Sequence, residues 1–231
     1  VSNPASPVVV NVVVLGGDVT GVVLDENRSL AYVTDESAGV HVVDISNAQN
    51  AQRVVTFNPE YNGSGKGARD VAISEDGSLL YVSSFSGLSV HQISGIADVQ
   101  QLWFGAGPGY FGEVLRAGDV LFVCQDRDKG LHAYDLSAPM EPLLIGRYFD
   151  SVLDVGVSHD SNELYVVTQG TISYGADFHG VIVCDLDAFL DVAEKGAFAS
   201  SRLYDVTSTS VVIDTVVGGP ESVALSADGE H

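Results

Sequence analysis

The sequence predicts an all-β protein, a β-propeller assembled from four-stranded antiparallel blades. Two observations support this prediction. A β-hairpin pattern recurs four times at intervals of about 41 to 49 residues, and a strand that begins with glycine follows each hairpin. Four short strands in a repeat of this length are typical of a propeller blade. A β-sandwich is the alternative all-β fold, but a sandwich need not repeat one pattern four times.

Each hairpin consists of an alternating apolar run, a polar turn, and a second run that contains an aromatic residue followed by valine. This combination is typical of two antiparallel strands joined by a short turn. The four hairpins are GVVLDENRSLAYVTD (21–35), DVAISEDGSLLYVSS (70–84), EVLRAGDVLFVCQD (113–126) and DVGVSHDSNELYVVT (154–168). The matching aromatic residues are Tyr32, Tyr81, Phe122 and Tyr165.

A third and a fourth strand complete each repeat. The third strands are GVHVVDIS (39–46), GLSVHQIS (87–94), GLHAYDLS (130–137) and GVIVCDLD (180–187). Their first glycine provides the backbone freedom needed to turn into the strand. The fourth strands are expected at 53–57, 100–104, 142–146 and 210–217. In the last repeat, residues 187–198 have helical spacing and a glycine stop, which predicts a short inserted helix.

The whole chain, residues 1–231, is therefore expected to be a single propeller segment. Residues 1–17 match the end of the repeats, and residues 218–231 match a first strand and its turn. We expect four complete blades at 18–58, 67–105, 110–149 and 151–217, with partial blades at both ends. Such a segment belongs to a larger propeller or multidomain chain. If its ring is incomplete, the end blades expose sheet faces and edges.

The charge of the chain excludes several classes of partner. Lysine and arginine total 10 and aspartate and glutamate total 31, for a net charge of −21. Such a polyanion is repelled by nucleic acid and by anionic membrane surfaces. No apolar run approaches the ~18 residues that span a bilayer, so membrane insertion is not expected. A diffuse acidic surface is compatible with a secreted, periplasmic or cell-surface protein, with a saline habitat, or with simple solubility.

Two motifs resemble known repeat families. GLHAYDLSAPMEP (130–142) resembles the third strand and following turn of LVIVD repeats, and VVIDTVVGGPESVALSADG (211–229) resembles a junction between YVTN-repeat blades. The chain is thus similar to the LVIVD-repeat and YVTN-repeat β-propellers of bacteria and archaea. The resemblance implies a module of a surface-layer, adhesive or other extracellular protein. Similar propellers also serve as lactone hydrolases and quinone-cofactor dehydrogenase subunits.

Three carboxylates occupy one aligned position on the strands expected to line the propeller axis. They are Asp70, Glu113 and Asp154, whereas Gly21 and Ser222 occupy this position in the other repeats. Carboxylates that converge on a channel could bind Ca²⁺, the only cofactor that the sequence suggests. They could also raise one another's pKa for acid–base chemistry. Alternatively, each accepts backbone hydrogen bonds within its own blade.

Two loops on one face of the propeller are candidates for partner recognition. The loop at 169–180 joins strands two and three of the fourth blade and carries Tyr174, Asp177, Phe178 and His179. Aromatic residues on a long loop suit recognition of a partner. The glycine-rich segment 58–70 carries the cations Lys66 and Arg69 and is expected to be a flexible surface loop.

Other polar and sulfur-containing residues are expected to have structural roles. Cys124 and Cys184 lie in apolar strand-like runs and are expected to be buried. His41 and His132 share one position in their third strands and are expected in the core or half-buried. Residues 126–128 contain two aspartates, but the pattern lacks most ligands of a calcium loop and indicates a solvated turn.

The leading functional hypothesis is a non-catalytic binding or scaffold module of an exported or cell-surface protein, which recognises a protein or glycan partner through its loop face. The alternative is an enzyme, a lactonase-like or other metal-assisted hydrolase that uses the carboxylates of the central channel. The sequence contains no complete catalytic constellation, which favours the binding module. A spacer without a ligand of its own is a third possibility.

Overall fold

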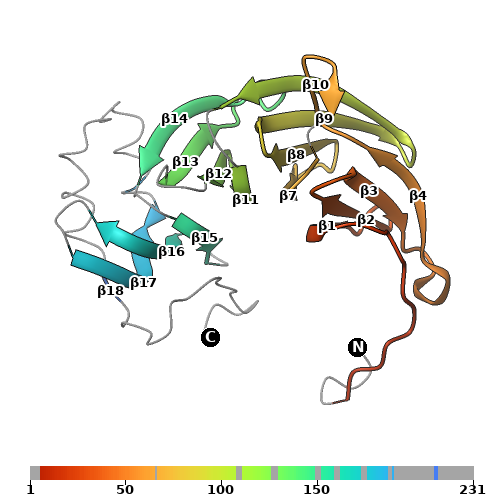
Figure 1. Ribbon diagram of the computed structural model, residues 1–231, viewed down its shortest axis with the longest axis horizontal. Helices are drawn as coiled ribbons and strands as arrows, with labels where there is room; N and C mark the ends of the chain where they lie inside the picture. Colours follow the sequence, from red (N-terminus) through yellow and green to blue (C-terminus); the bar gives the residue numbers. More distant parts are fainter. Residues whose placement is uncertain are drawn as a thin grey trace.

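The computed structural model describes residues 6–65, 67–107, 111–125, 130–148, 152–158, 162–172, 176–186, 189 and 211–212. Within them, four four-stranded antiparallel sheets stand side by side in an arc, as Figure 1 shows. In each sheet the strands follow one another in chain order from the inside of the arc to its outside. The prediction of a β-propeller built from four-stranded blades is confirmed.

The strands fall where the repeat predicts them. Blade one contains β1 (Val19–Asp25), β2 (Leu30–Asp35), β3 (Gly39–Asp44) and β4 (Gln52–Phe57). Blade two contains β7 (Asp70–Ile73), β8 (Leu79–Ser84), β9 (Gly87–Gly95) and β10 (Asp98–Ala106). Blade three contains β11 (Phe111–Ala117), β12 (Val120–Gln125), β13 (Gly130–Asp135) and β14 (Leu143–Tyr148). Blade four contains β15 (Val152–Val157), β16 (Glu163–Ile172), β17 (Ala176–Asp185) and β18 (Val211–Val212).

Smaller elements lie between the blades and at their turns. A two-stranded hairpin, β5 (Glu60–Tyr61) and β6 (Ser64–Gly65), connects blade one to blade two. A single 3₁₀ turn, η1 (Ala48–Asn50), precedes β4. Gly39 begins β3 with φ +101°, and a Cβ there would lie 2.3 Å from the carbonyl oxygen of Phe57. The glycine is therefore required both for the turn and for the close approach of β4.

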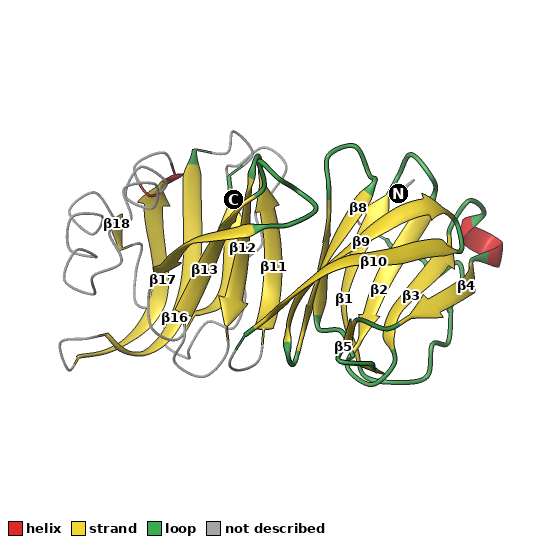
Figure 2. Ribbon diagram, turned by 90° about the horizontal axis from the view of Figure 1, so that it is seen from above, coloured by secondary structure: helices red, strands yellow, loops and turns green. Residues whose placement is uncertain are grey.

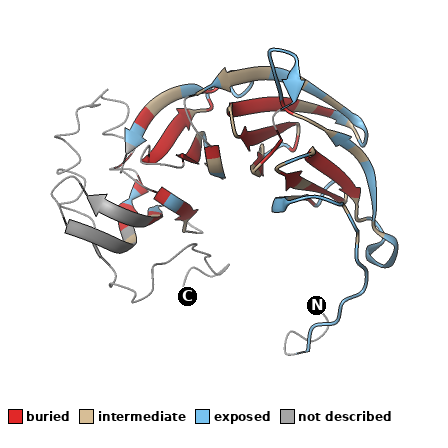
Figure 3. Cartoon of the chain, in the orientation of Figure 1, coloured by how far each residue is buried: buried red, intermediate tan, exposed pale blue. Residues whose placement is uncertain are grey.

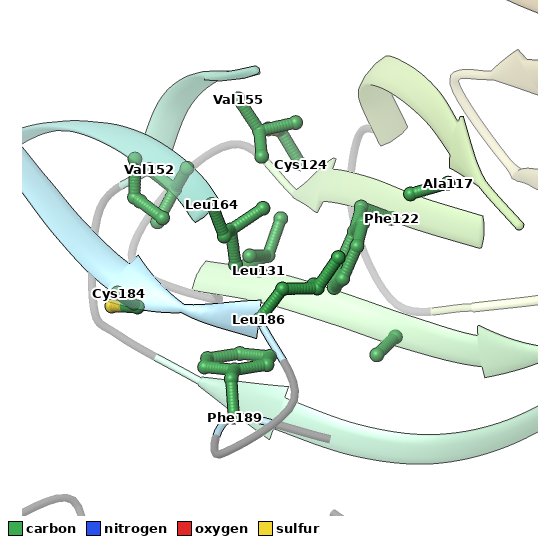
Figure 4. Close-up of a cluster of buried hydrophobic side chains, with 12 residues drawn as sticks. Ala117, Phe122, Cys124, Leu131, Val152, Val155, Leu164, Cys184, Leu186 and Phe189 are labelled. Carbon is green, nitrogen blue, oxygen red and sulfur yellow. The ribbon is translucent and has the colours of Figure 1, made fainter. Parts of the chain in front are cut away.

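The core consists of apolar layers between consecutive blades. We call the face that a blade turns towards the preceding blade its leading face, and the opposite face its trailing face. The trailing face of blade one packs on the leading face of blade two, and the same arrangement joins blades two and three and blades three and four. Figure 3 shows the resulting band of buried strands, and Figure 4 shows the layer between blades three and four.

The expected burial of both cysteines is confirmed. Cys124 and Cys184 are free and lie in the layer between blades three and four, where Figure 4 labels both. Burial raises the pKa of the Cys184 thiol to about 11 and that of Cys124 well above its usual value. Both side chains therefore pack as small apolar groups and are poor nucleophiles.

The predicted terminal partial blades have different outcomes. Residues 6–18 form no strand, so the fourth strand predicted for a preceding blade is unpaired here. This segment follows the outer edge of blade one, where Asn11 donates to the carbonyl of Ala51 at 3.1 Å. Residues 218–231 lie outside the described residues. So does the helix predicted at 187–198, apart from Phe189, which is buried in the core. Within the described part, no helix is long and apolar enough to cross a membrane.

Candidate functional site

A pocket of about 390 Å³ opens at the end of the blades where the inner strands begin. Side chains and backbone from all four blades line it: Thr20, Arg69, Asp70, Gly112, Glu113, Cys124, Val152 and Leu153. The sequence alignment of inner strands placed Asp70 and Glu113 at one position, and the structure brings them together in this pocket. Asp154, the third aligned carboxylate, is buried next to it.

Asp70 connects three blades. Its Oδ2 accepts a hydrogen bond of 2.7 Å from the backbone N–H of Val114 in blade three. Its Oδ1 lies against blade one, where a Cβ at Gly21 would be 2.4 Å away. The alternative that each axial carboxylate bonds only within its own blade is therefore wrong for Asp70. It describes Asp154 better, since Oδ1 of that residue accepts from the adjacent N–H of Val155 at 2.8 Å.

Asp70 and Glu113 are neighbouring carboxyl groups, and each affects the pKa of the other. Burial, and then the negative charges of Asp70 and Asp154, raise the pKa of Glu113 from 4.5 to about 8. Burial also raises the pKa of Asp70, although the bonds from Val114, Val71 and Glu113 counteract it. Glu113 therefore favours its protonated form at neutral pH, even though the residue is exposed.

The calcium hypothesis stays a prediction. In the part of the chain that the structure describes, no group of three or more His, Cys, Asp or Glu side chains is arranged to hold a metal ion. The charge of Asp154 raises the pKa of both Asp70 and Glu113. The pair is suited to exchanging hydrogen bonds and protons with a ligand.

The walls of the pocket contain hydrogen bonds between blades that the sequence reading missed. Thr34 Oγ1 donates to the carbonyl of Arg69 at 3.0 Å, and Ser83 Oγ donates to the carbonyl of Gly112 at 2.6 Å. Both hydroxyls occupy the same place on the second strand, and each bonds the residue just before the axial carboxylate of the next blade. The sequence did contain a signal for these bonds, because blades one and two both have a hydroxyl side chain at this position of the second strand. Blade three has Cys124 at this position of its second strand. The residue of blade four that corresponds to the acceptors Arg69 and Gly112 is Leu153.

Arg69 is anchored beside the pocket. Its Nε lies 3.2 Å from Glu36 Oε1, and its guanidinium lies 5.4 Å from the ring centre of Phe85. The flexible loop expected at 58–70 is instead a docked hairpin. The Gln101 side chain accepts from the N–H of Glu60 and donates to its carbonyl, both at 2.8 Å, and Tyr61 stacks on Phe104. Lys66 lies outside the described residues.

The long loop predicted at 169–180 is mostly a β-hairpin. Strands β16 and β17 continue their pairing through Gln169 with His179, Gly170 with Phe178 and Thr171 with Asp177. The loop prediction is therefore wrong for these three residues of β17, whereas Tyr174 lies outside the described residues. Because Thr168 pairs with Val152, a residue of the pocket, the β16–β17 hairpin extends beyond the end of the blade where the pocket lies. Figure 2 shows β16 and β17 extending beyond the neighbouring strands at one end of the blades.

The remaining polar candidates have structural roles or were not described. His41 is fully buried, with Nδ1 2.7 Å from Thr56 Oγ1 and Nε2 3.4 Å from Asp35 Oδ2. Burial would raise the pKa of Asp35, but bonds from Ser37 and Ala38 lower it to about 2. His132 is also buried, so both predictions of core histidines are confirmed. The acidic turn at 126–128 lies outside the described residues.

Comparison with known proteins identifies the repeat of blade one. Residues 16–54 match the LVIVD repeat. The resemblance seen in the sequence is thus confirmed, although the match lies in blade one rather than at 130–142. No curated protein matches the chain.

Solved structures share the fold of this chain. A protein from Lactobacillus plantarum is 15% identical with a TM-score of 0.58, over 72% of this chain and 53% of that one. A periplasmic gluconolactonase from Pseudomonas aeruginosa is 12% identical with a TM-score of 0.62, over 75% and 55%. Hydrazine synthase from Kuenenia stuttgartiensis is 17% identical with a TM-score of 0.55, over 92% and 78%. The chain spans about half the length of the first of these structures.

Proposed function

We propose that this propeller is a non-catalytic binding module of an exported or cell-surface protein, and that its axial pocket binds a glycan. The observation that carries the proposal is the neighbouring carboxyl groups of Asp70 and Glu113 in an open pocket of about 390 Å³. The two projecting hairpins, 60–65 and 169–180, lie on the same face and provide further surface for contact with the partner.

The pocket combines donors and acceptors as a neutral sugar requires. Glu113 is protonated and can donate, Asp70 is a strong acceptor, and the guanidinium of Arg69 adds fixed donors. Thr20 contributes a hydroxyl that can act in either role. Each hydroxyl of a sugar is both a donor and an acceptor. The hydroxyls of one sugar can therefore pair with these four side chains. An anionic ligand is disfavoured because the pocket is acidic and the whole chain has a net charge of −21.

The test is isothermal titration calorimetry of the chain with a panel of neutral mono- and oligosaccharides, carried out at pH 6.5 and at pH 9.5. Binding at pH 6.5 should weaken at pH 9.5, because ionised Glu113 no longer donates. Glu113→Gln keeps a donor that does not titrate, so it should bind equally at both pH values. Asp98→Asn removes an exposed carboxylate from the outer β9–β10 turn and should behave like the wild-type chain. Absence of binding, or binding that Arg69→Ala and Glu113→Ala leave unchanged, refutes the pocket assignment.

A protein partner is an outcome that the same design can detect. The triple replacement of Tyr174, Phe178 and His179 by alanine leaves the pocket intact. If this variant loses an identified protein partner while Glu113→Ala retains it, recognition belongs to the β16–β17 hairpin. The pocket would then have no part in binding that partner.

One observation favours a second candidate, a hydrolase that requires no metal. A carboxylic acid with a pKa of about 8 next to a carboxylate is a suitable general acid for opening a lactone or an acetal. In this function water attacks the carbon and forms the new C–O bond while the Asp70 carboxylate takes the proton of that water. Glu113 donates its proton to the leaving oxygen as the old C–O bond breaks. A panel of δ- and γ-lactones assayed at pH 7 would test it. Turnover that Glu113→Gln abolishes and Asp98→Asn retains establishes the hydrolase, and absence of turnover eliminates it.

A further inference from the structure

Two asparagines of this chain lie in the pattern Asn-x-Ser, in which the middle residue is not proline. They are Asn27, in the sequence NRS, and Asn62, in the sequence NGS. In an exported protein this pattern is the acceptor for N-linked glycosylation and belongs on a surface loop. Because the pattern is short, its structural context decides whether the asparagine is an acceptor. The transferase must reach both the asparagine amide and the serine hydroxyl from solvent.

Asn62 lies at the apex of the β5–β6 hairpin. Tyr61 pairs with Ser64, so Asn62 and Gly63 are the two residues of the turn. Their φ angles of +54° and +71° are both positive, as a type I′ turn requires. Asn62, Gly63 and Ser64 are all exposed, and a Cβ at Gly63 would meet no atom beyond its chain neighbours within 4 Å. The turn therefore presents the whole acceptor sequence to solvent.

The contacts that hold this hairpin in place lie before the turn. The Gln101 side chain bonds both the N–H and the carbonyl of Glu60 at 2.8 Å. Tyr61 stacks on Phe104, with their ring centres 5.0 Å apart. Figure 1 shows the hairpin beside β10, and Figure 3 draws it in the exposed colour. A sugar attached to Asn62 would therefore break none of these contacts.

The turn that contains Asn27 is held much more tightly. Arg28 Nη1 donates to Asp25 Oδ2 and to the carbonyl of Gly77 in blade two, both at 2.8 Å. Asp25 is buried, and Ser29, whose hydroxyl the transferase must reach, is half-buried. A transferase that binds this turn must separate Arg28 from a buried carboxylate, which is costly because that charge then lacks its partner. Asn27 therefore has the same pattern as Asn62 without its accessibility.

We propose that Asn62 is an N-glycosylation site, an inference that rests on the export of the chain in the proposed function but not on its pocket. The donor is an oligosaccharide joined through C1 of its first sugar to a polyprenyl diphosphate, and the catalyst is an oligosaccharyltransferase. The amide nitrogen of Asn62 forms a bond to C1 and loses one proton to a base of the transferase. The bond between C1 and the diphosphate oxygen breaks, and the diphosphate leaves with the electron pair.

A glycan at Asn62 would occupy the outer rim of the propeller. β10 is the outermost strand of blade two, and among the described residues it pairs along one edge only, with β9. A hydrated oligosaccharide beside this open edge hinders its pairing with a strand of another molecule. The pocket lies at the opposite side of the sheet, where the inner strand β7 begins with Asp70. The glycan therefore leaves the pocket accessible.

The test is in vitro glycosylation of the folded chain with a purified oligosaccharyltransferase and a polyprenyl-diphosphate-linked oligosaccharide, followed by peptide mass spectrometry. We expect the mass of one oligosaccharide on the peptide that contains Asn62. Asn62→Gln should abolish this mass increase, and so should Ser64→Ala, which keeps both residues of the turn. Asn27→Gln is the matched control and should be modified like the wild-type chain. The urea-unfolded chain should accept a second oligosaccharide at Asn27, because the contacts of that turn are then lost.

Two results of this assay overturn the proposal. One is a folded chain that stays unmodified when the unfolded chain is modified, and the other is a folded chain modified at Asn27 in preference to Asn62. Mass spectrometry of the protein from the cells that make it, and from their medium, separates this proposal from the proposed function. An exported chain that carries no glycan at Asn62 overturns the glycosylation site and leaves the binding module intact. A chain found only inside the cell refutes export and therefore both proposals.

Discussion

Replacing Glu113 with glutamine should remove most of the change in stability between pH 5 and pH 8. Burial and the neighbouring carboxylates raise the pKa of Glu113 from 4.5 to about 8 in the folded chain. Between these values the unfolded chain has lost the proton that the folded chain still holds. The folded state therefore binds more protons, and stability falls as the pH rises through this window.

The size of the effect depends on how well water screens the site. For a fully buried carboxyl, a rise in pKa from 4.5 to about 8 would correspond to roughly 5 kcal/mol. The Glu113 side chain is open to the channel, so screening leaves an effect on the order of 1 kcal/mol. For a chain of this size, that corresponds to a change in melting temperature of about 2–4 °C.

The assay is thermal unfolding by circular dichroism at pH 5, 6.5 and 8, at constant ionic strength. The wild-type melting temperature should fall across the series, and that of Glu113→Gln should fall less. Glu75→Gln is the control, because Glu75 is an exposed carboxylate on the β7–β8 turn that pairs with Arg116. It should retain the wild-type slope. If Glu113→Gln also retains that slope, Glu113 is ionised at neutral pH and its pKa is not raised.

Three further perturbations test the network around the site. Ser83→Ala removes the donor to the carbonyl of Gly112 and should lower the free energy of unfolding in urea by about 1–3 kcal/mol. A decrease below about 0.5 kcal/mol would show that this bond between blades contributes little to stability. The wild-type chain should lose stability as the pH falls from about 4 to 2, because Asp35 takes up a proton in this range, and Asp35→Asn should not show this loss. If the variant shows the same acid unfolding transition as the wild-type chain, the pKa of Asp35 is not lowered. Gln101→Ala should speed amide exchange in the 60–65 hairpin without changing the melting temperature, and unchanged exchange would mean that the stacking of Tyr61 alone holds it.

The blades were predictable because their strands repeat one pattern of local residues. The hairpin alternation and the glycine before each third strand depend on neighbours in the chain, and both appear in the structure at the expected positions. The common position of Asp70 and Glu113 followed from the same alignment. Contacts between distant segments were not predictable in this way. The bond from Val114 to Asp70 joins residues 44 positions apart, and no pattern within one blade specifies it.

The two hairpins were misread as loops for a physical reason. The sequence at 169–180 contains glycines and polar residues, and it lacks the apolar alternation of a half-buried strand. Pairing of β16 with β17 uses backbone groups, which are the same in every residue, so this pairing leaves little pattern in the sequence. The 60–65 hairpin contacts residues far away in the sequence: Gln101 bonds Glu60, 41 positions away, and Phe104 stacks on Tyr61.

The position of the pocket reflects a change in the repeat at blade three. Thr34 and Ser83 each donate a hydrogen bond from a hydroxyl to a backbone carbonyl of the next blade. We call this contact between the inner ends of two neighbouring blades the seam. Cys124 takes this place in blade three, and a thiol is a much weaker donor than a hydroxyl. The pocket includes both Cys124 and Leu153, the residue whose carbonyl would be the corresponding acceptor. We infer that the seam between blades three and four is held less tightly than the other two.

Restoring the hydroxyl should therefore stabilise this seam. Cys124→Ser places a donor at the position of Thr34 and Ser83, and one new hydrogen bond contributes about 1 kcal/mol, or about 2–4 °C in melting temperature. Cys124→Ala removes the thiol without adding a donor and should destabilise the chain. The order of melting temperatures should thus be serine above cysteine above alanine. If serine melts at or below alanine, the hydroxyl finds no acceptor at Leu153, and the seam between blades three and four differs from the others in its backbone rather than in this one side chain.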